Sequence, residues 1–280
     1  MKVALTEKPG PIGVFDSGYG GLTILHEIRQ LMPQYDYLYL GDNARTPYGT
    51  RSFEVVYEFT REAVQKLFDL GCHLVILACN TASAKALKTI QQNDLPQMEG
   101  ETRRVLGVIR PTAECIGQIT HSRHVGILAT SGTISSGSYP LEIRKLYPDI
   151  VVSGEACPMW VPLVENYEYD SPGADYFVEK RIGNLLRKDP AIDTIVLGCT
   201  HYPLLLNKIL NTLLVMCVSS PRRIRGLQPE RLPATSYGNR NVVYESGTCR
   251  FLTTESPDKF MESASIFLRQ HVEAERVVLE

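Results

Sequence analysis

The sequence contains no long apolar run and no marked excess of charge of one sign. No stretch of about 18 apolar residues occurs, and the first ten residues lack the apolar core of a signal peptide. The 29 Lys and Arg residues nearly balance the 31 Asp and Glu residues, so the net charge of -2 gives no general attraction to nucleic acid or to an anionic membrane. We therefore expect a soluble cytoplasmic protein with neither of these as a partner.

The sequence also lacks any C-x-x-C pair, although it has seven cysteines. Scattered cysteines in a cytoplasmic chain are not expected to form disulfides, so each one has to be considered for reactivity or for burial. At 280 residues, with 44% hydrophobic residues, the chain is long enough for one large domain or two ordinary ones.

Short apolar runs alternate with stretches of helical period. The runs lie at residues 12–15, 35–40, 74–78, 104–109, 124–129, 150–156 and 194–198, and the helical pattern is clear at 20–32, 52–70 and 141–147. Continuous Val, Ile and Leu runs separated by helices are typical of a parallel sheet that is covered on both faces. The sequence therefore predicts an α/β fold.

A weak internal repeat suggests two similar halves. The runs at 12–15 and 125–129 end in the polar turns DSG and TSG, and the runs at 74–78 and 195–198 end in CNT and CTH. In open parallel sheets, ligands bind outside the carboxyl ends of the strands. Two such halves facing each other would put Cys79 and Cys199 on opposite walls of one cleft.

Both cysteines are expected at strand-to-helix turns, where free backbone N–H groups point outward. A thiol becomes a useful base only when its thiolate is accessible, and such donors favour the thiolate. The same N–H groups, with the hydroxyls of Thr81 and Thr200, could hold a substrate carboxylate.

Two titratable residues at the predicted strand ends could assist these cysteines. His201 could move the proton of Cys199, because histidine titrates near neutrality. Asp16 could act in the same way for Cys79. One thiolate that removes a proton, opposite a thiol that supplies one, is what inversion of a stereocentre requires.

Each of these features has a simpler interpretation. Either cysteine alone could be a core residue, and His201 alone could make a structural hydrogen bond. We expect Cys72, Cys115, Cys157 and Cys249 to be structural. The glycines of DSGYGG resemble a phosphate-binding loop only loosely. Zinc held by Cys79, Cys199, His201 and Asp16 is a further alternative, although zinc ligands are usually closer in sequence.

Five segments, in order along residues 13–206, resemble the cofactor-independent glutamate racemases of the aspartate/glutamate racemase family. They are GVFDSGYGGLT, GDNARTPYGTRS, ILACNTASA, CPMWVPLVE and IVLGCTHYPLL. The resemblance implies two α/β domains with parallel sheets, related by a pseudo-two-fold axis, with the active site in the cleft between them.

The resemblance also implies a proton transfer at the α-carbon of glutamate, with no pyridoxal phosphate and no metal. Cys79 would take the proton from D-glutamate with help from Asp16, and Cys199 would take it from L-glutamate with help from His201. The implied substrate-binding residues are Asp16, Ser17, Tyr48, Gly49, Asn80, Thr81, Thr200, His201 and Glu165. The implied role is to supply D-glutamate for peptidoglycan, and a homodimer is one assembly that the resemblance leaves open.

The C-terminal region departs from the family pattern. Residues 219–236 hold four arginines and three prolines with no helical or strand period. One hypothesis is that residues 215–241 are translated out of frame; a basic surface loop is the alternative. We expect a first domain of residues 1–106 plus 212–280 and a second of 107–211, and the first would lose a strand and a helix if the segment is as written.

Three functions remain open from the sequence. TPYG around Tyr48 and the segment CTHYPLL favour glutamate racemase. A related aspartate or hydantoin racemase is an alternative in the same class. A glutamate-binding homologue whose catalysis is impaired by the segment 215–241 is an alternative in another class.

Overall fold

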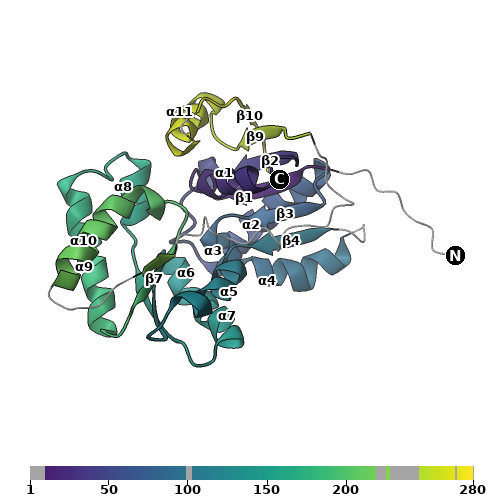
Figure 1. Cartoon of the computed structure of the whole chain (residues 1–280). Coiled ribbons are helices and arrows are strands. Elements are labelled where there is room, and N and C mark those ends of the chain that lie inside the picture. The colour runs from purple at the N-terminus through teal and green to yellow at the C-terminus, as the bar shows by residue number, and fades with distance from the viewer. Residues whose placement is uncertain (1–9, 99–102, 219–224, 228–245, 269, 280) are drawn as a thin grey trace.

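Two parallel β-sheets form the framework of the chain (Figure 1). The computed structural model describes residues 10–98, 103–218, 225–227, 246–268 and 270–279. The first sheet has the order β10 (Ala274–Arg276), β9 (Cys249–Thr253), β2 (Tyr37–Gly41), β1 (Ile12–Asp16), β3 (Leu74–Leu77) and β4 (Arg104–Gly107). The second has the order β6 (Val151–Ala156), β5 (His124–Ala129), β7 (Thr194–Gly198) and β8 (Arg225–Leu227).

The seven strands predicted from apolar runs are β1 to β7, so the α/β prediction is confirmed. The strand order also repeats: β2-β1-β3-β4 in the first sheet corresponds to β6-β5-β7-β8 in the second. All the neighbouring strands in both sheets are parallel. The polar turns found as an internal repeat therefore follow equivalent strands, β1 and β5 for one pair and β3 and β7 for the other.

Helices cover both faces of each sheet. The α-helices are α1 (Gly21–Leu31), α2 (Phe53–Asp69), α3 (Asn80–Lys85), α4 (Leu87–Thr89), α5 (Ile109–Ile119), α6 (Ser131–Ser136), α7 (Ser138–Leu146), α8 (Trp160–Glu165), α9 (Pro172–Lys188), α10 (Leu206–Val218) and α11 (Pro257–Leu268). Shorter helical segments lie at Asn43–Arg45, Ile90–Asp94, Leu95–Gln97 and Tyr202–Leu205.

Side chains that alternate along each strand produce separate cores on the two faces. On β1, Val14 packs with α1 and α11, while Phe15 packs with α2 and α3 on the other face. On β7, Leu197 packs with α8, α9 and α10, while Val196 packs with α5 and α7. This double coverage accounts for the uninterrupted apolar runs in the sequence.

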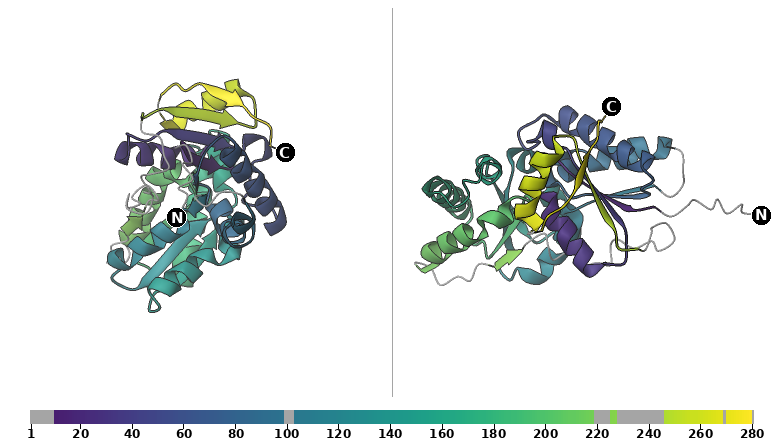
Figure 2. Two further views of the ribbon diagram at one scale, coloured as in Figure 1. Left: turned by 90° about the vertical axis from the view of Figure 1, so that its right-hand side faces the viewer. Right: turned by 90° about the horizontal axis from the view of Figure 1, so that it is seen from above.

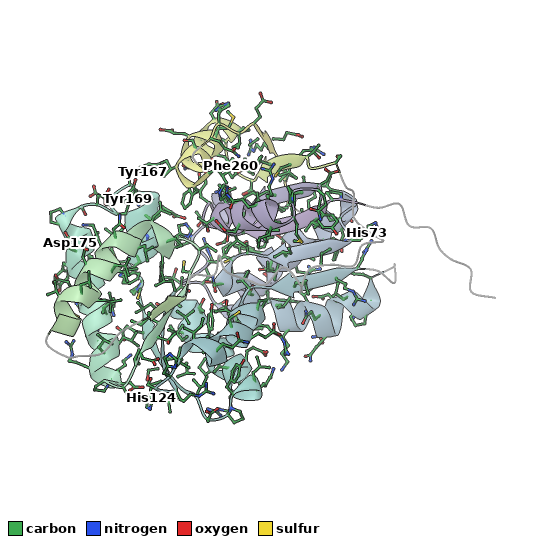
Figure 3. The ribbon with its side chains drawn as sticks, viewed as in Figure 1. His73, His124, Tyr167, Tyr169, Asp175 and Phe260 are labelled. Carbon is green, nitrogen blue, oxygen red and sulfur yellow. The ribbon has the colours of Figure 1, made fainter. Side chains whose placement is uncertain are left out.

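The first sheet is completed by the end of the chain. In Figures 1 and 2 the yellow β9, β10 and α11 lie against the purple β1 and α1, although they are far apart in sequence. β9 pairs with β2 along Tyr37–Gly41, and Phe260 of α11 is completely buried. The same helix reaches the second half, because Tyr167 lies 3.1 Å from the Ser263 hydroxyl (Figure 3).

The C-terminal prediction is only partly covered by the described residues. Most of the segment 215–241, and with it the test of the frame-shift hypothesis, lies outside them. Within it, Arg225–Leu227 differs from the expected irregular stretch, because it pairs with β7 as an edge strand of the second sheet. The division at 107–211 remains a proposal, and β8 adds to the second sheet a strand from beyond residue 211.

No helix within the described ranges is both long and apolar enough to cross a membrane.

The packing of α11 gives a prediction about stability. Phe260→Ala should lower the free energy of unfolding by about 3–5 kcal/mol, because it opens a cavity between α11 and the sheet. Urea unfolding followed by circular dichroism measures the change. The control is Leu31→Ala, which removes a side chain that is 56% exposed at the end of α1 and should change stability by less than about 0.5 kcal/mol. Equal effects of the two variants would contradict the described packing of α11.

Candidate active site

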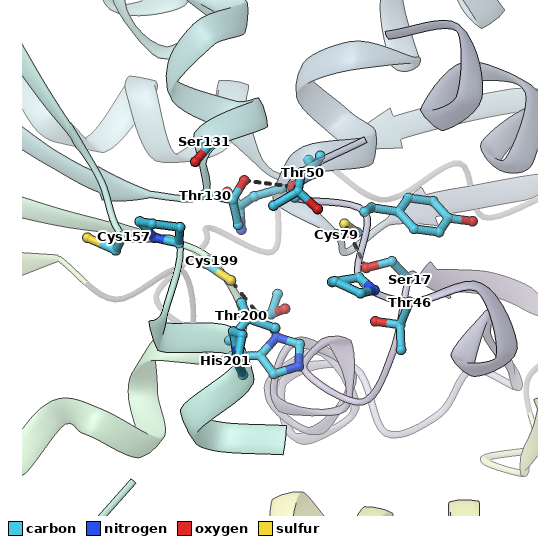
Figure 4. Close-up of a pocket in the computed structure, with 18 residues that line it drawn as sticks. Ser17, Thr46, Thr50, Cys79, Thr130, Ser131, Cys157, Cys199, Thr200 and His201 are labelled. Atoms are coloured by element: carbon cyan, nitrogen blue, oxygen red, sulfur yellow. Dashed lines mark hydrogen bonds between the residues drawn. The ribbon is translucent and has the colours of Figure 1, made fainter. Parts of the chain in front are cut away.

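A pocket lies between the carboxyl ends of the two sheets (Figure 4). Most of the predicted site residues line it, namely Ser17, Tyr48, Gly49, Cys79, Asn80, Thr81, Cys199, Thr200 and His201. Asp16 and Glu165 are not among the lining residues and lie behind them. In Figure 4 the sulfur atoms of Cys79 and Cys199 are turned toward the same space from opposite halves.

Cys79 lies two residues beyond the end of β3 and is the N-terminal cap of α3. Its sulfur accepts a hydrogen bond from the Ala82 N–H at 3.4 Å and lies 3.3 Å from the Ser17 hydroxyl. Burial and, after it, the nearby Asp16 charge raise the pKa of Cys79 to about 12, against the lowering effect of these two hydrogen bonds. At neutral pH Cys79 is therefore a neutral thiol, able to donate a proton.

Cys199 has a different partner. Its sulfur lies 3.9 Å from Nδ1 of His201, whose Nε2 lies 3.0 Å from the Glu165 carboxylate at the end of α8. Burial opposes a charge on the ring, but the hydrogen bonds with Cys199 and Glu165 outweigh it and raise the pKa of His201 to about 10. A protonated His201 places a positive charge beside the Cys199 sulfur.

Asp16 ends β1 and is almost completely buried. Its carboxylate accepts a hydrogen bond from the Gly18 N–H at 2.9 Å. Burial raises the pKa of Asp16, while the positive charge of His201 lowers it. The carboxyl group is thus placed within electrostatic reach of Cys79 and His201 but behind the pocket wall.

Gly20 of DSGYGG allows close packing between the two halves. A Cβ atom at Gly20 would lie 2.3 Å from Oγ1 of Thr200 and 2.6 Å from Nδ1 of His201. Glycine is required there because the turn after β1 lies directly against the turn after β7. This contact explains Gly20 without a phosphate ligand.

Tyr48 contributes to the pocket differently from a simple side-chain ligand. Its hydroxyl donates to the buried carboxylate of Asp42, which also accepts from Arg45 at 2.7 Å and from Thr254 at 2.8 Å. The ring is therefore fixed with its hydroxyl pointing away from the pocket. Tyr48 therefore does not offer its hydroxyl to a ligand in the pocket.

Asn80 and Thr81 present polar groups at the start of α3. The Asn80 Oδ1 accepts from the Tyr139 hydroxyl at 2.7 Å, while its buried Nδ2 has no hydrogen-bond partner within the described part of the chain. Oγ1 of Thr81 lies 2.9 Å from that of Thr130 and 3.3 Å from that of Thr133. An unsatisfied buried amide is costly, and a ligand oxygen would satisfy it.

Sequence reasoning did not assign several residues that line the pocket: Thr46, Pro47, Thr50, Thr130, Ser131, Cys157, Pro158, Val161 and Pro162. The repeat was the signal for two of them, because Thr130 and Ser131 in TSG of the second half correspond to Asp16 and Ser17 in DSG of the first. The Cys157 sulfur points away from the pocket in Figure 4 and contacts the Glu155 carbonyl at 3.7 Å.

A zinc site was one alternative for the cysteine and histidine residues. Among the residues that the structure describes, no group of three or more His, Cys, Asp or Glu side chains is arranged to hold a metal ion.

Comparison with known proteins assigns the chain to a family. Residues 22–222, most of the chain, match the model of the Asp/Glu/Hydantoin racemase family. The chain belongs to this family. A glutamate racemase of Streptococcus equi subsp. equi is 38% identical over 96% of this chain and 98% of that protein. A glutamate racemase of Oceanobacillus iheyensis is 44% identical over 71% of this chain and 69% of that protein.

Solved structures of racemases in this family have the same fold. A glutamate racemase isoform from Bacillus anthracis superposes with a TM-score of 0.84 at 32% identity, covering 96% of this chain and 98% of that one. The glutamate racemase of Francisella tularensis, solved in complex with D-glutamate, gives 0.81 at 28% identity, covering 97% and 98%. The resemblance noted from five sequence segments is confirmed.

The contact between Glu165 and His201 generates a prediction about protonation. Because the pKa of His201 is raised above its ordinary value of about 6.5, the protonated ring stabilises the folded protein at low and neutral pH. This contribution is lost as the pH rises through about 10. Glu165→Gln should move the pKa of His201 down by at least about one unit, so that the contribution is lost at lower pH.

Nitrogen-15 NMR titration of the His201 ring measures the shift. The control is Glu168→Gln, which removes an exposed carboxylate three residues away and should leave the titration of His201 unchanged. An unchanged titration in Glu165→Gln would contradict the assignment of Glu165 as the partner that keeps His201 charged.

Proposed function

We propose that this chain is a glutamate racemase that interconverts L- and D-glutamate with Cys79 and Cys199 as its two acid–base groups. The observation that carries the proposal is the pair of thiols from equivalent strand ends, turned toward one pocket from opposite sides. A planar carbanion formed between them can be protonated on either face. The similarity to glutamate racemases over nearly the whole chain supports the choice of reaction.

The two different thiol environments suggest the resting protonation state. Protonated His201 favours a Cys199 thiolate, while burial keeps Cys79 a neutral thiol. From this state the Cys199 sulfur takes the α-proton of L-glutamate, so that a C–H bond breaks and an S–H bond forms. Cys79 then gives its own proton to the opposite face of the carbon. D-Glutamate is formed, with the thiolate now at Cys79.

The α-carbon of glutamate is a weak acid, so the pocket must stabilise the negative charge that develops when its proton is removed. The developing charge spreads onto the α-carboxylate. Fixed N–H donors in a buried site stabilise this charge with little reorganisation, and one donor lowers the barrier by about 3 kcal/mol. The free amide of Asn80 and the hydroxyls of Ser17, Thr81 and Thr200 are suited to the α-amino and carboxylate groups. The N–H groups of Tyr48 and Gly49 are suited to the side-chain carboxylate, which selects glutamate.

The remaining parts of the proposal concern the setting of the enzyme. D-Glutamate is a building block of peptidoglycan, so we infer a role in bacterial cell-wall synthesis in the cytoplasm. Asp16 and Glu165 would act from behind the pocket, through Cys79 and His201 respectively. The proposed reaction uses neither pyridoxal phosphate nor a metal, and a homodimer is the proposed assembly.

The two-base assignment predicts the effect of removing each thiol. Cys79→Ala and Cys199→Ala should each lower racemisation by at least about a thousandfold, because each removes a group that moves a proton. Circular dichroism of D-glutamate, without added cofactor, measures turnover. Cys115→Ala is the control, since Cys115 lies on α5 outside the pocket and should leave turnover unchanged.

Further measurements separate glutamate racemase from its alternatives. Exchange of the glutamate α-proton with solvent deuterium in the wild-type protein supports the proposal. Tight binding of glutamate without exchange would identify a binding protein instead. Faster turnover of aspartate or of a hydantoin than of glutamate would assign a different substrate.

A further inference from the structure

The loop at residues 46–51 forms one side of the pocket and is held by both halves of the molecule. From the second half, the Gly132 N–H donates to the Gly49 carbonyl at 2.8 Å, and the Thr46 hydroxyl donates to Glu165 at 3.4 Å. From the first half, Nζ of Lys85 donates to the Arg51 carbonyl at 2.6 Å. The position of Tyr48 and Gly49 in the pocket depends on these contacts.

Lys85 is unusual because it is a buried cation whose hydrogen bond goes to a main-chain carbonyl. It is only 9% exposed, and within the described ranges no carboxylate lies at ion-pair distance from it, although the charge of Glu54 opposes the lowering of its pKa by burial. Burying an ammonium group without an ion-pair partner is unfavourable, so its hydrogen bond to the loop matters more than one made by a surface lysine. A charged donor also gives a stronger bond to the carbonyl than a neutral donor does.

Close packing fixes the ammonium group beside the loop. A Cβ atom at Gly132 would lie 3.0 Å from the Gly49 carbonyl oxygen, 3.1 Å from Cε of Lys85 and 3.2 Å from its Nζ. Gly49, Lys85 and Gly132 thus meet at one point, and the absence of a side chain on Gly132 leaves the space that Lys85 occupies.

The location of Lys85 connects the loop to the thiol. Lys85 is the last residue of α3, and Cys79 is the N-terminal cap of the same helix. This helix therefore carries the Cys79 sulfur at one end. At the other end, Lys85 contacts the loop 46–51 through the Arg51 carbonyl. Its length sets the separation between the proton donor and the N–H groups of Tyr48 and Gly49.

We propose that Lys85 is a positioning residue for substrate binding, which holds the loop 46–51 at the correct distance from Cys79. The inference rests on the proposed function, because it assumes that the loop binds the side-chain carboxylate of glutamate. Lys85 does not line the pocket and acts through the main chain of the loop. Its loss should therefore weaken substrate binding more than it slows proton transfer.

Lys85→Met tests the inference, because methionine keeps most of the side-chain length and removes the charge and the donor. We expect KM for both enantiomers to rise roughly tenfold, as for the loss of one charge-assisted hydrogen bond, with kcat within about twofold of the wild type. Lys85→Arg keeps a charged donor and should restore KM to within about threefold. Lys88→Met, an exposed lysine three residues further on, is the matched control and should behave as the wild type.

The pattern of variants distinguishes positioning from a general effect on folding. An unchanged KM in Lys85→Met, or equal impairment in Lys85→Arg and Lys85→Met, would overturn the inference. If Lys85→Met does not fold, Gly132→Ala decides, because its methyl group presses on Lys85 and on the Gly49 carbonyl. A rise in KM with kcat retained supports the inference, and wild-type KM in Gly132→Ala overturns it.

Binding measurements keep this inference separate from the proposed function. Calorimetric titration with D-glutamate in the Cys199→Ala background gives Kd without turnover, and adding Lys85→Met should raise Kd roughly tenfold for the same reason as KM. If the protein with both thiols binds D-glutamate but does not racemise it, the proposed function is overturned, and the ratio of the two Kd values still tests Lys85. If the protein with both thiols is active and the two Kd values are equal, only the role of Lys85 is overturned.

Discussion

The common direction of the strands in each sheet is the constraint on which the site depends. Because all strands of a parallel sheet run the same way, their carboxyl ends and the turns that follow them collect along one edge. In this chain the turns after β1 and β3 meet those after β5 and β7, and Gly20 lets the two sets touch. The proposed acid–base groups Cys79, Cys199 and His201 are carried by these turns, and Glu165 is hydrogen-bonded to one of them.

The two halves repeat the same order of four strands, but the surroundings of their cysteines differ. Cys79 and Cys199 follow equivalent strands, yet one sulfur contacts a hydroxyl and a backbone N–H and the other contacts a histidine that carries a carboxylate partner. A symmetrical site would leave the protonation state undefined. In the proposed reaction this asymmetry distinguishes the thiol that donates the proton from the one that removes it.

Much of this arrangement could be predicted from the sequence, because the relevant signals are local. Continuous apolar runs located the strands, and Cys79 and Cys199 stood out because each follows a run directly. Glu165, in contrast, was placed near the site only by family resemblance, and its contact with His201 required coordinates. Lys85 and Arg51 are 34 residues apart, and no local pattern indicates that a lysine at the end of a short helix will meet that carbonyl. The edge strand β8 was also missed, since three residues next to proline and arginine carry no period, and pairing with β7 decides their conformation.

The return of the chain to its first sheet has a consequence for synthesis on the ribosome. β2 is covered by β9, which is translated only after the whole second half has been made. During that time the nascent first half presents an open strand edge and an apolar surface that Phe260 will later cover, both of which favour aggregation. The packing of β9 and α11 onto the first sheet is therefore the step that ends this exposure. Errors in the region just before β9 would prolong the time that the unfinished protein spends in need of a chaperone.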